Sequence, residues 1–189
     1  MFDLWTRQKT LRRQHVPGAV VFVTATTRCR HPFFADPTHA ATAVGSVAQV
    51  QDRGLWGALA FAIMPDHVHL LVHLRRDATI SQAMTHYKWR AAASIRAAQG
   101  PGRVWEERFY DRTIRREEEL TQVVEYIQWN PVKAEFCDQP EDFAYCSAHP
   151  DYIDACELLI NQALGGGSLT ADDPSSTSTW NPNEADRLE

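Results

Sequence analysis

The stretch Met64-Pro65-Asp66-His67-Val68-His69-Leu70-Leu71-Val72 joins a turn to a predicted β-strand. Successive side chains of a strand point to opposite faces of the sheet, so His67 and His69 share one face and Val68 lies on the other. Two neighbouring imidazoles provide half of a metal site, because neutral imidazole is a common metal ligand. A half-buried strand with two histidines on its polar face fits this stretch equally well.

A second apolar segment precedes the turn, and the two segments form a predicted hairpin. Residues 55–64 are apolar on both faces, as expected of a buried central strand. Proline at position 65 favours a tight turn, and the next strand is predicted over residues 67–74. The hairpin therefore places both histidines at the end of a sheet, where loops and ligands can reach them.

Further strands and helices are predicted on either side of the hairpin. Residues rich in β-branched side chains predict a strand, and apolar residues at helical spacing predict a helix. Strands are predicted over residues 19–27 and 109–114, and helices over residues 38–53, 79–98, 117–129 and 151–164. Pro131 is expected to end the third of these helices near Trp129.

The order of these elements indicates the fold class. Strand, helix, strand, strand, helix, strand is the order of the split βαβ arrangement. We therefore predict an α+β protein with a ferredoxin-like antiparallel sheet, helices on one face of it and additional C-terminal helices. Residues 1–17 are predicted to be a basic arm, residues 18–164 a single domain, and residues 165–189 a disordered acidic tail rich in Gly, Ser and Thr.

Composition limits the class of protein further. A chain of 189 residues with 44% hydrophobic and 23% charged residues is typical of an ordinary globular protein. The longest apolar run, residues 58–64, is too short to cross a bilayer, and the N-terminus lacks the apolar segment of a signal peptide. The four cysteines are scattered without a Cys-x-x-Cys pair, which is typical of reduced thiols. We expect a cytoplasmic protein.

The net charge of −5 at first discourages a nucleic-acid partner, but the charge is unevenly distributed. After Ala163 the chain holds five acidic residues against Arg187 alone, so the rest is almost neutral. Basic residues cluster in the N-terminal arm and again between residues 88 and 116. Because local patches decide phosphate binding, DNA or RNA remains a possible partner.

A second group of candidate residues lies in the predicted helix that begins at residue 117. Tyr126 and Asn130 are four residues apart, so they are neighbours on one face of the helix. Without other evidence, such a pair is more commonly structural: the tyrosine lies at the edge of the core and the asparagine ends the helix. Of the other tyrosines, Tyr87 lies on an apolar stripe and is predicted to be core, and Tyr110 has no partner at metal-ligand spacing.

Three segments together resemble a known family, the REP-associated tyrosine transposases of the single-tyrosine HUH superfamily. The segments are residues 64–71, residues 104–115 and residues 126–133, and the resemblance extends over roughly residues 16–147. The resemblance implies the same ferredoxin-like core. Two departures are Asp66, where the family usually has Asn, and Tyr145-Cys146-Ser147, where it has a Trp-Ser-Ser-like sequence.

The resemblance also implies roles for particular residues. It makes His67 and His69 metal ligands, Asn130 the third ligand and Tyr126 the nucleophile. The implied activity is cleavage and rejoining of single-stranded, hairpin-forming repeat DNA through a 5′-phosphotyrosine intermediate. The implied cofactor is Mg²⁺ or Mn²⁺, and imidazole ligands favour Mn²⁺. With DNA bound, the protein would be associated with the nucleoid; monomer and homodimer both remain open.

Basic and aromatic residues supply candidate DNA contacts. Trp105 or Trp129 could stack on a base. The candidate phosphate contacts are Arg12, Arg13, Lys88, Arg108, Arg112, Arg115, Arg116 and Lys133.

Two other classes of function fit the sequence. One is a DNA-binding regulator of the same fold that has lost catalysis, although His67, His69 and Tyr126 are all intact. The other is a metal-dependent hydrolase that uses His67, His69 and His73 with water as the nucleophile. His73 shares a strand face with the histidine pair but lies further along than direct coordination favours.

Overall fold

The computed structural model describes residues 18–165. The predicted basic arm, with Arg12 and Arg13, and the predicted tail after residue 165 lie outside the described residues. Within residues 18–165, no helix is long and apolar enough to cross a membrane.

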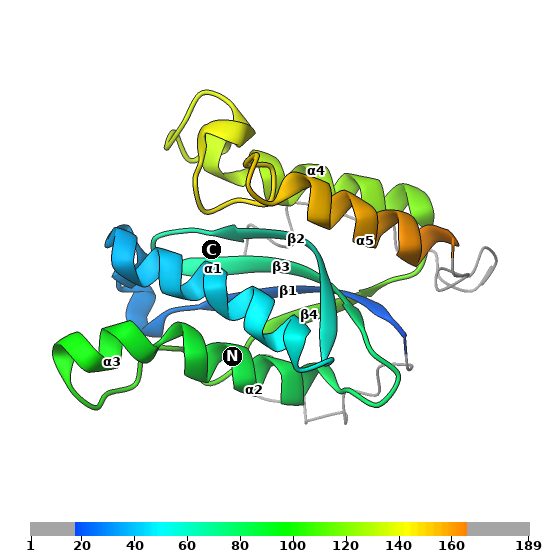
Figure 1. The fold of residues 1–189 in the computed structure, drawn as a ribbon. Coiled ribbons are helices and arrows are strands. Elements are labelled where there is room, and N and C mark those ends of the chain that lie inside the picture. The colour runs from blue at the N-terminus through cyan, green and yellow to red at the C-terminus, as the bar shows by residue number, and fades with distance from the viewer. Residues whose placement is uncertain (1–17, 166–189) are drawn as a thin grey trace, which may run out of the picture.

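A four-stranded antiparallel sheet forms the centre of the fold (Figure 1). Its strands are β1 (Val20–Thr26), β2 (Trp56–Ile63), β3 (His67–Leu74) and β4 (Tyr110–Ile114), and their order in the sheet is β2-β3-β1-β4. This order, with one helix between β1 and β2 and more helix between β3 and β4, confirms the predicted ferredoxin-like α+β fold. The hairpin of β2 and β3 lies as predicted, with the histidine pair at its turn.

Helices cover both faces of the sheet (Figure 1). One face packs on α1 (Pro37–Asp52), α2 (Ile80–Ala91) and α3 (Ala93–Gln99). The other face packs on α4 (Glu117–Lys133) and α5 (Ile153–Gly165), the additional C-terminal helices. Successive side chains of β3 point alternately into the two cores. The core on the α1 and α2 side contains Val68, Leu70, Val72 and Leu74, and the core on the α4 side contains Leu71.

The predicted helix over residues 79–98 is divided into α2 and α3 at Ala92. Side chains take part in the backbone hydrogen bonding just before this break. The Trp105 indole donates to the Lys88 carbonyl at 2.9 Å, and the Arg96 guanidinium donates to the Trp89 carbonyl. Both donors are side chains and lie outside the regular backbone hydrogen bonds of the helix. Neither glycine nor proline occurs at the break, so the local sequence carries no signal for it.

The prediction that Pro131 ends its helix near Trp129 is wrong, because α4 continues to Lys133. Proline lacks an N–H, so the Ile127 carbonyl, four residues earlier, loses its helical donor, yet the helix continues for two more residues. The carbonyls of Asn130 and Pro131 still accept hydrogen bonds, from Ala134 and Phe136, each at 3.0 Å. Asn130 therefore lies within regular helix, one turn after Tyr126.

Candidate active site

The two histidines lie side by side at the start of β3, beneath α4. His67 is 5% exposed and His69 is fully buried. Their Nε2 atoms are 3.2 Å apart. If one ion lay about 2.1 Å from each nitrogen, this separation would correspond to an angle of about 100° at the ion, which suits tetrahedral or octahedral coordination. The pair therefore fits a single metal ion.

Each imidazole is oriented through its other nitrogen. His67 Nδ1 is 2.7 Å from Asp66 Oδ1, and His69 Nδ1 is 3.0 Å from Thr24 Oγ1. An ionised carboxylate only accepts hydrogen bonds, so Nδ1 of His67 is the donor. The hydrogen bond from His67, together with the electrostatic attraction of His67 and then of Arg30, holds the pKa of Asp66 below its usual range despite partial burial. Such outer partners are what orient metal-binding histidines.

The loop after β1 holds the Pro65-Asp66 turn in place. The backbone N–H and the hydroxyl of Thr27 both donate to the Asp66 carbonyl, each at 2.8 Å. Within the same loop, Cys29 and Arg30 have φ angles of 53° and 52°, in the left-handed region. For residues other than glycine this costs about 1–2 kcal/mol each, so the surrounding contacts must hold the loop. One such contact joins the Cys29 N–H to Glu106 Oε1 at 2.9 Å.

Helix α4 brings Tyr126 to the histidine pair. The Tyr126 ring packs edge-on against His69, with centroids 5.4 Å apart, and against Phe22 at 6.1 Å. Asn130 lies one helical turn further on the same face and is 6% exposed. The Lys133 ammonium lies 5.0 Å from the centre of the Tyr126 ring. One helix thus brings a phenol ring against His69, and it carries an amide one turn further on and an ammonium group over the phenol ring.

The structure separates the competing tyrosines. Tyr87 is fully buried in the core between the sheet and α1–α2, on the opposite side from the histidines, and burial raises its pKa strongly. It is therefore core, as predicted. Tyr110 lies closer to the site than the sequence suggested, because it pairs with Thr24 and packs against Phe22 at 6.2 Å. Tyr110 is the competitor that an experiment has to exclude.

His73 does not join the histidine pair. It pairs with Val20 and Gly57 and lies four residues beyond His69, which corresponds to about 13 Å along a strand. A three-histidine hydrolase site is therefore not assembled. Within residues 18–165, no group of three His, Cys, Asp or Glu side chains could hold a metal ion. Beyond the imidazole pair, the amide of Asn130 is the candidate protein ligand on α4.

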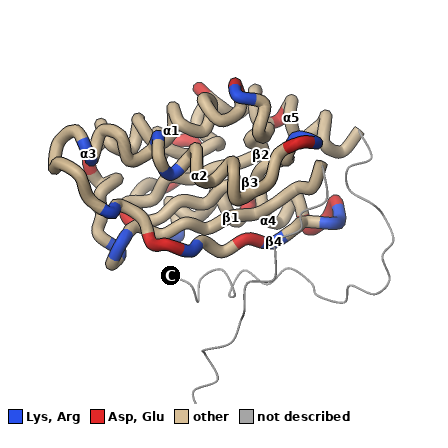
Figure 2. The backbone as a smooth tube through the Cα atoms, turned by 90° about the horizontal axis from the view of Figure 1, so that it is seen from below, with Lys and Arg blue, Asp and Glu red and all other residues tan. Residues whose placement is uncertain are grey.

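Two of the candidate phosphate contacts already have partners within the protein. Lys88 donates to the Glu106 carbonyl at 2.9 Å and lies over the Trp105 and Phe109 rings. Arg112 forms a largely buried ion pair with Glu119 at 2.7 Å, which joins β4 to α4. Arg108, Arg115, Arg116 and Lys133 are exposed. Figure 2 shows acidic and basic positions interleaved along the β4 edge, so this edge is not a uniformly basic strip.

Sequence reasoning missed one exposed aromatic residue, Trp89 at the end of α2. It is 61% exposed, and the guanidinium groups of Arg90 and Arg96 lie 5.4 and 5.6 Å from its ring. Of the two predicted stacking residues, Trp105 is buried and Trp129 is 43% exposed. The available signal was the position of Trp89 off the apolar stripe of its helix, between two basic residues.

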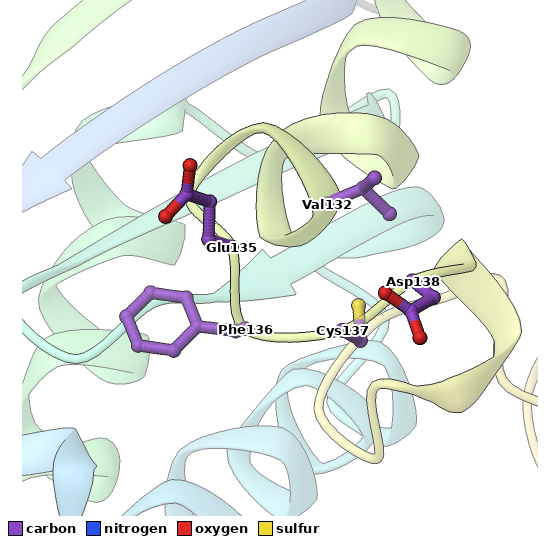
Figure 3. Close-up of a pocket in the computed structure, with 5 residues that line it drawn as sticks. All are labelled: Val132, Glu135, Phe136, Cys137 and Asp138. Carbon is purple, nitrogen blue, oxygen red and sulfur yellow. The ribbon is translucent and has the colours of Figure 1, made fainter.

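A surface recess beyond the end of α4 is separate from the histidine pair. Figure 3 shows its five lining residues, which come from the last turn of α4 and the segment that follows: Val132, Glu135, Phe136, Cys137 and Asp138. Two of the five are acidic, which disfavours a phosphate chain. Burial, followed by the negative charges of neighbouring carboxylates, also raises the pKa of Cys137, so its thiol is a poor nucleophile.

The site combines two histidines on a strand with a tyrosine on the helix that packs over them. Comparison of the chain with protein families identifies the class of protein that has this arrangement. The model of the family described as "Transposase IS200 like" matches residues 18–130, and the chain belongs to this family. Its relatives within the family are REP-associated tyrosine transposases, as the three sequence segments predicted.

Two relatives and one solved structure illustrate this similarity. The chain is 28% identical to a protein of Haemophilus influenzae named as a REP-associated tyrosine transposase, over 49% of this chain and 59% of that one, less than two thirds of its length. It is 25% identical to the Escherichia coli K12 REP-associated tyrosine transposase, over 74% of this chain and 82% of that one. The structure of a REP-associated tyrosine transposase bound to a REP hairpin superposes with a TM-score of 0.64 at 21% identity, covering 92% of this chain and 97% of that chain, which confirms the fold.

Proposed function

We propose that this transposase cleaves and rejoins single-stranded DNA with Tyr126 as its nucleophile. The observation that carries the proposal is the contact of the Tyr126 ring with His69, whose Nε2 lies 3.2 Å from Nε2 of His67. A nucleophile beside a candidate metal site is the arrangement that phosphodiester cleavage requires. Because Tyr126, His67 and His69 are all present, we favour a catalytic protein over a DNA-binding regulator that has lost catalysis.

The chain's own residues perform the following roles in this proposal. His67, His69 and Asn130 would hold one divalent ion, Mn²⁺ or Mg²⁺, and the bound ion would supply polarisation of the scissile phosphate and positive charge to offset its developing negative charge. The Tyr126 hydroxyl gives up its proton to solvent as its oxygen bonds to phosphorus, the bond from phosphorus to the 3′ oxygen breaks, and the 3′ oxygen takes up a proton from solvent. Lys133, whose ammonium lies over the Tyr126 ring, attracts the same phosphate. The 5′-phosphotyrosine link conserves the bond for rejoining.

We further propose that the substrate is a hairpin-forming repeat with a single-stranded flank, bound in the cytoplasm at the nucleoid. The relatives named for REP sequences and the solved structure with a REP hairpin support this substrate class. The decisive test is a covalent protein–DNA adduct. A single-stranded REP-like hairpin with its flank, incubated with protein and Mn²⁺, is expected to yield an SDS-stable complex and a free 3′-hydroxyl fragment. A water-using hydrolase would release both fragments without an adduct.

Trp89 is expected to contribute to binding of the single-stranded flank. Its ring is exposed and lies near the guanidinium groups of Arg90 and Arg96, which attract phosphate, and stacking of one base on an aromatic ring contributes about 1–3 kcal/mol. Trp89→Ala should therefore weaken binding of the flanked hairpin by about 5- to 140-fold in a fluorescence anisotropy titration. Phe136→Ala is the matched control, because Phe136 is a similarly exposed aromatic in the acidic recess. Equal losses for both variants would contradict a specific role for Trp89.

A further inference from the structure

A chain of polar contacts extends from the histidine pair into the strained loop after β1. His67 Nε2 faces His69, and His67 Nδ1 contacts Asp66 Oδ1 at 2.7 Å. The second oxygen of the same carboxylate, Oδ2, contacts Arg30 Nε at 3.0 Å. Both oxygens of Asp66 are thus used, one toward the candidate metal ligand and one toward the loop.

The backbone around these contacts holds the chain in position. Thr27 binds the Asp66 carbonyl twice, and the Phe34 N–H donates to the Pro65 carbonyl at 2.9 Å. Arg30 itself is in the left-handed region, which few residues other than glycine adopt, and its side chain pairs with Asp66. Local backbone strain of this kind clusters where geometry matters for function.

We propose that Arg30 and Asp66 are positioning residues that fix the ring orientation and tautomer of His67, and thereby set the affinity of the site for its divalent ion. Arg30 prevents rotation of the carboxylate, and the carboxylate keeps the proton on Nδ1 of His67. Nε2 of His67 then presents its lone pair toward His69. This inference rests on the proposed metal-dependent function and deepens it.

The chemistry of residue 66 gives the proposal its specific content. Residue 66 carries a carboxylate, whose two oxygens contact His67 and Arg30. An asparagine oxygen could also accept the Nδ1–H hydrogen bond, but it carries no charge and forms no ion pair with Arg30. A charged acceptor makes the imidazole a more basic ligand, so the carboxylate should tighten metal binding beyond what an amide achieves.

The test measures Mn²⁺ binding to the full-length protein without DNA, from the EPR signal of free Mn²⁺. Loss of an outer partner of a metal-binding histidine typically weakens metal binding about 10- to 100-fold, and we expect a rise in Kd of this size for Asp66→Ala. Asp66→Asn, which is nearly the same size, should give a smaller rise, as should Arg30→Ala. Arg30→Lys should recover part of the loss. Arg103→Ala is the matched control, since Arg103 belongs to an exposed pair with Glu107 at 3.9 Å.

A spectroscopic measurement separates positioning from general stability. The imidazole ¹⁵N signals of metal-free protein, with His67 assigned by substitution, should show Nδ1 protonated in the wild type and a mixture of tautomers in Asp66→Ala. If Asp66→Ala binds Mn²⁺ as tightly as the wild type with His67 in one tautomer, the proposal is overturned. If the wild type binds Mn²⁺ and responds to these substitutions but forms no DNA adduct, the positioning role stands and the proposed function fails.

Discussion

Tyr126→Phe is expected to eliminate the SDS-stable protein–DNA adduct completely while leaving hairpin binding unchanged. The substitution removes only the hydroxyl oxygen that would bond to phosphorus. The aromatic ring that packs on His69 and Phe22 remains, so the local packing is retained. The measurement is a denaturing gel of labelled hairpin DNA incubated with Mn²⁺ and protein, alongside an anisotropy titration for binding.

Tyr110→Phe is the matched control for this experiment. Tyr110 contacts Phe22 as Tyr126 does, and it lies on the same face of the sheet, beyond Thr24. It comes from edge strand β4 and not from the helix that covers the histidines. Its phenylalanine variant should form adduct at the wild-type level. Persistence of adduct in Tyr126→Phe together with its loss in Tyr110→Phe would identify Tyr110 as the nucleophile and contradict the proposed mechanism.

His67→Ala and His69→Ala are each expected to abolish cleavage and to weaken Mn²⁺ binding by more than about 100-fold, since even outer partners of a metal-binding histidine change affinity 10- to 100-fold. With one imidazole removed, the remaining protein ligands cannot hold the ion at neutral pH. Mn²⁺ titration by EPR and adduct formation on gels give two independent readouts. Chelation of the metal with EDTA should abolish adduct formation by the wild type in the same way.

Two further variants define the metal site. Asn130→Ala should weaken Mn²⁺ binding less than either histidine variant and raise the Mn²⁺ concentration required for cleavage, because an amide is a weaker ligand than imidazole. His73→Ala should leave both readouts near the wild-type level, because His73 pairs with Val20 at the far end of β3. A His73→Ala loss as large as that of His67→Ala would favour the three-histidine hydrolase instead.

Much of the fold could be predicted because it depends on local patterns. Alternating apolar residues and a proline turn specify the hairpin of β2 and β3, and helical spacing of apolar residues specifies α1 and α4. The predicted bounds of two elements were wrong, because the apolar patterns do not encode the contacts made there. Trp105, from the segment before β4, donates to the α2 backbone where the helix divides. Helix α4 continues past Pro131 to Lys133, and the Ala134 and Phe136 N–H groups bind the carbonyls of Asn130 and Pro131 at its end.

The sequence by itself determined that His67 and His69 share one face of a strand and that Tyr126 and Asn130 share one face of a helix, because both facts follow from the periods of strand and helix. Only the tertiary structure decided that these two faces meet. Packing of α4 over β3 brings Tyr126 to His69, since apolar residues beside each group are buried in the same core. The fold likewise decided that Arg30 reaches Asp66, because a left-handed loop held by Thr27 brings them together. Such long-range contacts result from global packing, which local sequence periods do not encode.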